Sequence, residues 1–177
     1  MKITPRLFVL SGFVFVAAAA RLIPDIANNF QPIFAMALFG GATFEDRRQA
    51  FLIPLAALVI SDWVLGFHNL MLLVYLMFVV TVVIGLWVRK QTSIERIALG
   101  SFVSATLFFL VTNFGVWIDG SLYPLTTAGL VNCYTMALPF YGRTLLSFAV
   151  FGTLLFGGFW MLQREFPKLR MHEPRMA

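Results

Sequence analysis

The residues that could bind a ligand or take part in a reaction are a small set of polar side chains. They lie in a chain that is 60% hydrophobic and 12% charged. Asp62 lies inside an apolar stretch, and amide side chains gather at 28–31, just before another. Carboxylates and amides hydrogen-bond polar solutes, and aromatic neighbours such as Trp63 and Trp117 stack on flat rings, a mixture typical of small-molecule pockets. The candidate binding residues are Asn28, Asn29, Gln31, Asp62, His68, Asn113, Asp119, Tyr123 and Asn132.

The same polar residues also allow a purely structural interpretation. Polar groups within a membrane are costly unless they are paired or face water. Arg21 could pair with Asp25 or Asp119, and Asp62 with a neighbouring amide. Trp and Tyr would then form only an interfacial belt.

The sequence lacks the motifs of several enzyme classes. It contains no phosphate-binding loop, no His-Glu-x-x-His and no Cys-x-x-Cys. With one Cys and two His, we expect no metal site and no cofactor. A triad of Ser121, His68 and either Asp62 or Asp119 has no supporting context. We therefore expect no enzymatic activity, and the scarcity of charge excludes nucleic-acid binding.

The elements that must position these residues are membrane-spanning helices. A helix needs about 20 mainly apolar residues to cross the hydrocarbon core of a bilayer. A shorter run, 33–44, reaches a workable length only with the polar segment before it, so we expect its outer end to be irregular and either buried in protein or lining a cavity. The five full-length runs are 7–23, 50–67, 70–88, 97–118 and 144–162. The second and third of these runs are so close that we expect a tight hairpin.

The stretch 121–142 is interrupted by Pro and Gly, and its apolar part is too short to span a membrane. We predict a short re-entrant or interfacial helix there, between helices 5 and 6. The fold class is therefore an all-α integral membrane protein with six transmembrane helices. Residues 1–162 form one transmembrane domain, and residues 163–177 form a basic cytoplasmic tail.

Basic residues predict the orientation of these spans. With six spans, eleven of the 13 Lys and Arg fall on one side: near both termini and in the connections at 45–49 and 89–96. The positive-inside rule places this side, and both termini, in the cytoplasm. The first run also has the basic start and Ala-x-Ala pattern of a cleavable signal peptide. Its removal would leave the orientation of the other spans unchanged.

Several strings resemble a group of uncharacterised bacterial inner-membrane proteins over about residues 7–162. They are Asn-Asn-Phe-Gln-Pro at 28–32, Ala-Leu-Phe-Gly-Gly-Ala at 37–42, Ser-Asp at 61–62, Gly-Phe-His at 66–68, Thr-Asn-Phe-Gly-Val-Trp at 112–117 and Ala-Leu-Pro-Phe at 137–140. That group is distantly similar to the substrate-binding S components of energy-coupling factor (ECF) transporters. The resemblance implies six helices with both termini inside and a vitamin-like ligand near the outer face. It also implies an energising ATPase module as a partner.

The functional hypothesis is a membrane-embedded subunit that binds and takes up a small micronutrient through an outward-facing polar and aromatic cavity. The sequence does not identify the solute. The alternative is a non-transporting scaffold or assembly protein of the cell envelope, which predicts exposed stripes of small residues and no cavity. An enzyme using Asp62 and His68 is a third hypothesis. If the first holds, Asp62→Ala should abolish solute retention and leave expression intact.

Overall fold

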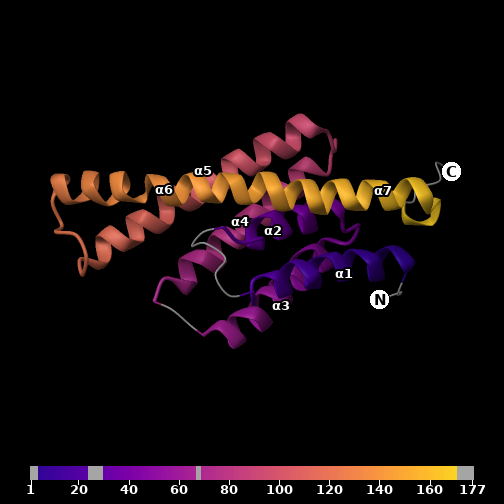
Figure 1. The fold of residues 1–177 in the computed structure, drawn as a ribbon, viewed down its shortest axis with the longest axis horizontal. Coiled ribbons are helices and arrows are strands. Elements are labelled where there is room, and N and C mark those ends of the chain that lie inside the picture. Colours follow the sequence, from indigo (N-terminus) through magenta and orange to yellow (C-terminus); the bar gives the residue numbers. More distant parts are fainter. Residues whose placement is uncertain (1–3, 24–29, 67–68, 171–177) are drawn as a thin grey trace.

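A computed structural model describes residues 4–23, 30–66 and 69–170 of the chain, and these residues form helices and connecting loops without a strand (Figure 1). The helices are α1 (Pro5–Ala20), α2 (Ile33–Thr43), α3 (Arg47–Leu65), α4 (Met71–Val88), α5 (Ile94–Asp119), α6 (Thr127–Gly152) and α7 (Gly158–Glu165), with a π-helical segment at Thr153–Gly157 and a 3₁₀ turn at Pro167–Leu169.

Polar side chains mark where the long helices begin. Asp46, Ser93 and Thr126 each accept a hydrogen bond from a backbone N–H in the first turn of α3, α5 and α6, respectively. These bonds satisfy N–H groups that have no partner within the helix. At the far end of α5, Gly120 has φ 71°, a left-handed conformation that suits glycine and ends the helix.

Four helices are long and apolar enough to cross a membrane: Arg47–Leu65, Met71–Val88, Ile94–Asp119 and the continuous helix Thr127–Glu165. The outer faces of these helices carry many exposed large apolar side chains. The protein is therefore a helical membrane protein. Helices α1 and α2 are also apolar but shorter, with 16 and 11 residues.

The prediction of a separate re-entrant or interfacial helix at 121–142 is wrong. Residues 121–126 form the connection after α5, and from Thr127 the chain runs as one helix of 39 residues to Glu165. At about 1.5 Å per residue this helix is roughly 58 Å long, about twice the thickness of a hydrocarbon core. Pro139 lies within it. Proline is tolerated in membrane helices because neighbouring groups compensate for the lost hydrogen bond.

Cross-helix hydrogen bonds hold the first half of α6 against α5. The Tyr134 hydroxyl donates to the backbone carbonyl of Leu110 at 2.7 Å. Further along, the hydroxyl oxygens of Thr106 and Tyr141 lie 2.9 Å apart. These contacts give residues 127–142 a partner along their length, which hydropathy averaged over a window does not reveal.

Helix α2 lies at the centre of the bundle. All of its residues from Ile33 to Thr43 are buried, and it contacts α1, α3, α4, α5 and α6. A helix that is apolar on every side belongs inside protein rather than at a surface. The expectation of burial concerned the polar segment before this helix, in which Pro32 is buried and Phe30 and Gln31 are partly exposed; the burial of the helix itself was not predicted.

A close helix crossing joins α2 to α4. A Cβ atom added to Gly41 would lie 2.2 Å from the backbone oxygen of Val82 and 2.8 Å from the Cα of Gly85. Two glycines facing each other let helix backbones approach closely. Helix α4 consequently packs mainly on α2 and only slightly on α3. The expected tight hairpin between these two long helices is wrong.

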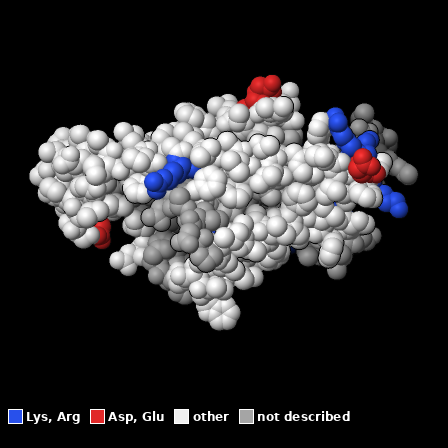
Figure 2. Space-filling view, in the orientation of Figure 1, with Lys and Arg blue, Asp and Glu red and all other residues white. Residues whose placement is uncertain are grey.

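Arginine side chains tie several connections together at one end of the molecule. Arg6 donates to the carbonyl of Thr43 at 2.7 Å and to that of Leu169, and its Nε lies 3.4 Å from a carboxylate oxygen of Glu45. Arg89 donates to the carbonyl of Phe44 at 2.6 Å. The start of α1 and the turn Pro167–Leu169 lie at this end (Figure 1), where Lys and Arg also gather, whereas the rest of the face seen in Figure 2 shows few charges.

Candidate functional site

A buried ion pair joins the end of α1 to the last turn of α3. Arg21 caps the C-terminus of α1, and its Nη2 lies 2.7 Å from Oδ1 of Asp62. The two side chains are 8% and 7% exposed. The alternative that paired Arg21 with Asp119 is therefore wrong, and among the described residues Asp62 is paired with Arg21 rather than with an amide. Asp25, the other proposed partner of Arg21, lies outside the described residues.

Arg21 makes two further contacts that extend this pair into a network. Its Nη1 donates to the Ser61 hydroxyl at 2.5 Å, and its Nε donates to Oε1 of Gln31 at 3.3 Å. The Ser61 hydroxyl in turn donates to the carbonyl of Leu58 at 2.8 Å. The guanidinium is therefore held from several directions, and it holds the side chain of Gln31 in one orientation.

Tyr75 of α4 is a member of this neighbourhood that the sequence did not single out. Its hydroxyl is buried and has no hydrogen-bond partner among the described residues. The charges of Asp62 and Arg21 interact electrostatically with this hydroxyl. The signal in the sequence was a single phenol within an otherwise apolar span, but periodicity does not show which helix such a group faces.

Gln31 also lines a cavity of about 520 Å³ whose other lining residues come from α5, α6 and the connection between them. Its volume is within the range of about 300–1,000 Å³ that is usual for small-molecule sites. Three of the predicted site residues, from three separate segments, meet here. The residues that line it are Gln31, Asn113, Val116, Leu122, Tyr123, Cys133, Met136, Ala137 and Phe140.

Backbone contacts fix two polar groups of this cavity. The Nδ2 of Asn113 donates to the carbonyl of Phe109, one turn earlier on α5, at 2.8 Å. The thiol of Cys133 on α6 donates to the carbonyl of Asn113 at 3.4 Å. Of these two bonds, only that of the Cys133 thiol joins α6 to α5, because the Asn113 amide bonds within its own helix.

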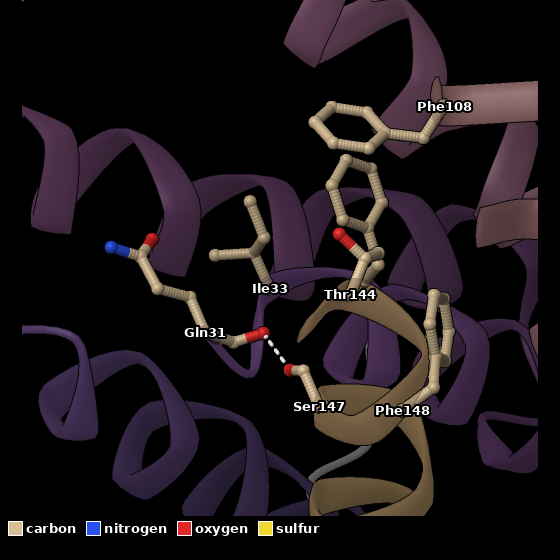
Figure 3. A pocket seen from close by; sticks show the side chains of 7 residues that line it. Gln31, Ile33, Phe108, Thr144, Ser147 and Phe148 are labelled. Atoms are coloured by element: carbon tan, nitrogen blue, oxygen red, sulfur yellow. Dashed lines mark hydrogen bonds between the residues drawn. The ribbon is translucent and has the colours of Figure 1, made fainter. Parts of the chain in front are cut away.

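A second, much smaller cavity adjoins Gln31 on its backbone side (Figure 3). Its volume of about 40 Å³ is enough for one or two water molecules. Ser147 of α6 donates to the backbone carbonyl of Gln31 at 2.5 Å, and the Gln31 amide points away from Thr144 and Phe148. Gln31 therefore borders both cavities, with its backbone anchored to α6.

The remaining predicted site residues do not meet at the large cavity. Asp119 is exposed, and its carboxylate accepts a hydrogen bond from Ser121 at 2.5 Å. Asn132 is exposed on α6 and does not line the cavity. Trp63 is 77% exposed and does not line it either, so aromatic contact comes instead from Tyr123 and Phe140. The predicted residues Asn28, Asn29 and His68 lie outside the described residues.

Among the described residues, no group of three or more His, Cys, Asp or Glu side chains is arranged to hold a metal ion. The chemistry available at the cavity is hydrogen bonding by amides and a phenol, surrounded by apolar and aromatic contact. Neither Arg21 nor Asp62 lines the cavity. Asp62 therefore influences the cavity only indirectly, by holding Arg21, which in turn holds Gln31.

Comparison with known proteins gives one match. The model of DUF6580, a family of unknown function, matches residues 1–169. No curated protein and no solved structure matches the chain.

Proposed function

The chain belongs to the DUF6580 family, whose function is unknown, and from its cavity we propose a membrane-embedded protein that binds and takes up a small, vitamin-like molecule. The observation that carries this proposal is the cavity of about 520 Å³, at which Gln31, Asn113 and Tyr123 come together. Gln31 is far along the chain from Asn113 and Tyr123, in a sequence that has few polar side chains. Polar side chains gathered at one hollow of an otherwise apolar bundle are costly within a membrane unless they meet water or a partner, which favours a role in binding.

The burial of small residues favours uptake over the scaffold alternative. A scaffold would present stripes of small residues on its outer surface. Of four pairs of small residues spaced four apart, Ala37 and Gly41 of α2 and Ala57 and Ser61 of α3 are buried, and Ala105 of the third pair is buried as well. Only Thr153, in the pair Thr153 and Gly157, is exposed. The buried residues serve close packing within the bundle. A hollow of about 520 Å³ lined by polar side chains is likewise not expected of a scaffold.

We further propose that the end bearing the termini faces the cytoplasm of a bacterial inner membrane. The basic side chains gathered there support this orientation through the positive-inside rule. In this arrangement, related to that of ECF S components, α1 and α2 cross the bilayer together with adjoining segments. The cavity then opens toward the outside. Inward release requires rearrangement of the helices, by the protein alone or with an energising ATPase module.

Labelling of engineered cysteines tests this orientation. Ser121 and Thr92 are exposed residues that lie just beyond opposite ends of α5. In spheroplasts, a membrane-impermeant maleimide should label Ser121→Cys, whereas Thr92→Cys should react only after permeabilisation. The wild type measures the background, since its Cys133 is 2% exposed. The reverse labelling pattern would overturn the orientation.

Filling the cavity tests the binding function. Ala137 lines it and is 5% exposed, so Ala137→Phe should occupy part of the hollow. Native mass spectrometry of gently purified protein should find a small molecule bound to the wild type. At least a tenfold lower bound fraction is expected in the variant, because a well-packed interior leaves no space for both ring and solute.

The matched control is Ala149→Phe, which makes the same change at an exposed position of the same helix. It should retain the bound molecule, and both variants should unfold at similar temperatures. Equal retention by the two variants would argue against the cavity as the binding site. The absence of any bound small molecule in the wild type would favour the scaffold alternative.

A further inference from the structure

The orientation of the Gln31 amide determines what it offers to the cavity. An arginine side chain has only donors, so the atom that faces Nε of Arg21 must be the amide oxygen. Arg21 is itself held by Asp62 at 2.7 Å and by Ser61 at 2.5 Å, which keeps its position fixed. The Nε2 group of Gln31, with two N–H donors, is left to face other partners.

Asn113 has the opposite polarity. Its Nδ2 donates to the carbonyl of Phe109 at 2.8 Å, and a carbonyl only accepts, so the amide cannot be reversed without losing this bond. Its Oδ1 therefore remains an acceptor with no partner among the described residues. At the cavity, the Gln31 amide therefore presents a hydrogen-bond donor and the Asn113 amide presents an acceptor.

Charged groups do not contribute to the described lining of the cavity. The nearby charges of Arg21 and Asp62 neutralise each other behind Gln31. Arg143 is exposed and packs over the ring of Phe140, 5.7 Å from its centroid, without lining the cavity. An ionised solute would give up part of its hydration against this lining, and no described lining residue would offer it an opposite charge in return, which is unfavourable.

We infer that the cavity selects an uncharged solute that offers a hydrogen-bond acceptor to Gln31 and a hydrogen-bond donor to Asn113. Cyclic amides and ureides combine the two groups on one neutral ring, and the ring itself suits contact with Tyr123 and Phe140. This inference rests on the proposed function, because it specifies the class of molecule bound in the same cavity.

Three matched probes test the inference on the full-length protein in nanodiscs, with empty nanodiscs as the blank. The probes are 2-quinolinone, which has both groups, 1-methyl-2-quinolinone, which lacks the donor, and ionised quinoline-2-carboxylate. Calorimetric titration should show 2-quinolinone binding about tenfold or more tightly than either of the others, because an unmet buried hydrogen bond costs that much or more.

Two variants then assign the contacts. Gln31→Glu keeps an oxygen for Arg21 but removes the donor, so it should weaken 2-quinolinone binding about tenfold. Gln91→Glu makes the same change at an exposed position before α5 and should leave binding unaltered. Asn113→Leu removes the acceptor and should weaken the binding of 2-quinolinone. Binding of the N-methyl derivative should change much less, because that probe has no donor for Asn113.

The outcomes separate this inference from the proposed function. Probes that bind equally well, with binding lost in Ala137→Phe, would overturn the selectivity and leave the cavity as a binding site. A molecule that co-purifies with the wild type but not with Ala137→Phe, while no probe binds, would likewise overturn the selectivity and leave the cavity as a binding site. If no probe binds and nothing co-purifies with the wild type, both the inference and the proposed function fail.

Discussion

Replacing Asp62 with alanine should destabilise the protein by about 3–5 kcal/mol, because it leaves a buried arginine charge without its partner. Arg21 is 8% exposed and has its shortest carboxylate contact with Asp62. The freed guanidinium should also release the side chain of Gln31, so retention of solute should be lost as well. A thiol-reactive dye that reports exposure of the buried Cys133 would follow thermal unfolding, and native mass spectrometry would follow retention.

Two controls separate the loss of the ion pair from a general effect of substitution. Asp119→Ala removes an exposed carboxylate and should change stability little. The double substitution Arg21→Met with Asp62→Leu should regain most of the lost stability, since apolar residues often replace a buried ion pair at little cost. It should not regain solute retention, because nothing then orients Gln31. A single Asp62→Ala variant as stable as the wild type would contradict the buried pair.

The second large effect is expected at the crossing of α2 and α4. Gly41→Ala should destabilise the protein by about 3 kcal/mol or more, since overpacking against atoms that cannot rotate away forces the helices apart. The added Cβ would lie 2.2 Å from the backbone oxygen of Val82 and 2.8 Å from the Cα of Gly85. The same thermal unfolding assay measures the change.

Gly142→Ala is the matched control for this prediction. Gly142 lies within α6, and a Cβ there would have no heavy atom within 4 Å. Alanine is the better helix former by about 1 kcal/mol, so this variant should be as stable as the wild type or slightly more so. Equal behaviour of the two glycine variants would show that α2 and α4 do not cross at Gly41.

The contrast between Asp62 and Asn113 shows how far the candidate site could be predicted. Both were singled out as polar residues within apolar stretches, and both are part of the site neighbourhood. The sequence treated Asp62 as a direct ligand of the solute, whereas it lies in an ion pair behind the cavity. Its partner, Arg21, is 41 positions away in the chain, and no local pattern indicates which acidic residue it meets.

The stretch 121–142 shows the same limit for the fold. Pro139 and the glycines in this stretch suggested a helix too short to span, yet contacts such as that of Tyr134 with Leu110 continue it into one long helix. Local composition detects residues that weaken an isolated helix. It does not detect the neighbouring helix that compensates for them.

By itself, the sequence determined that this is a helical membrane protein, where its long apolar helices α3, α4 and α5 lie, and that the segment 33–44 is too short to cross a membrane alone. These properties follow from hydropathy and helix length, which are local along the chain. Only the tertiary structure decided that Arg21 pairs with Asp62, that Gly41 faces Gly85, and that Gln31, Asn113 and Tyr123 share one cavity. Such contacts depend on how helices cross and rotate against one another, and that geometry is set by packing between distant residues.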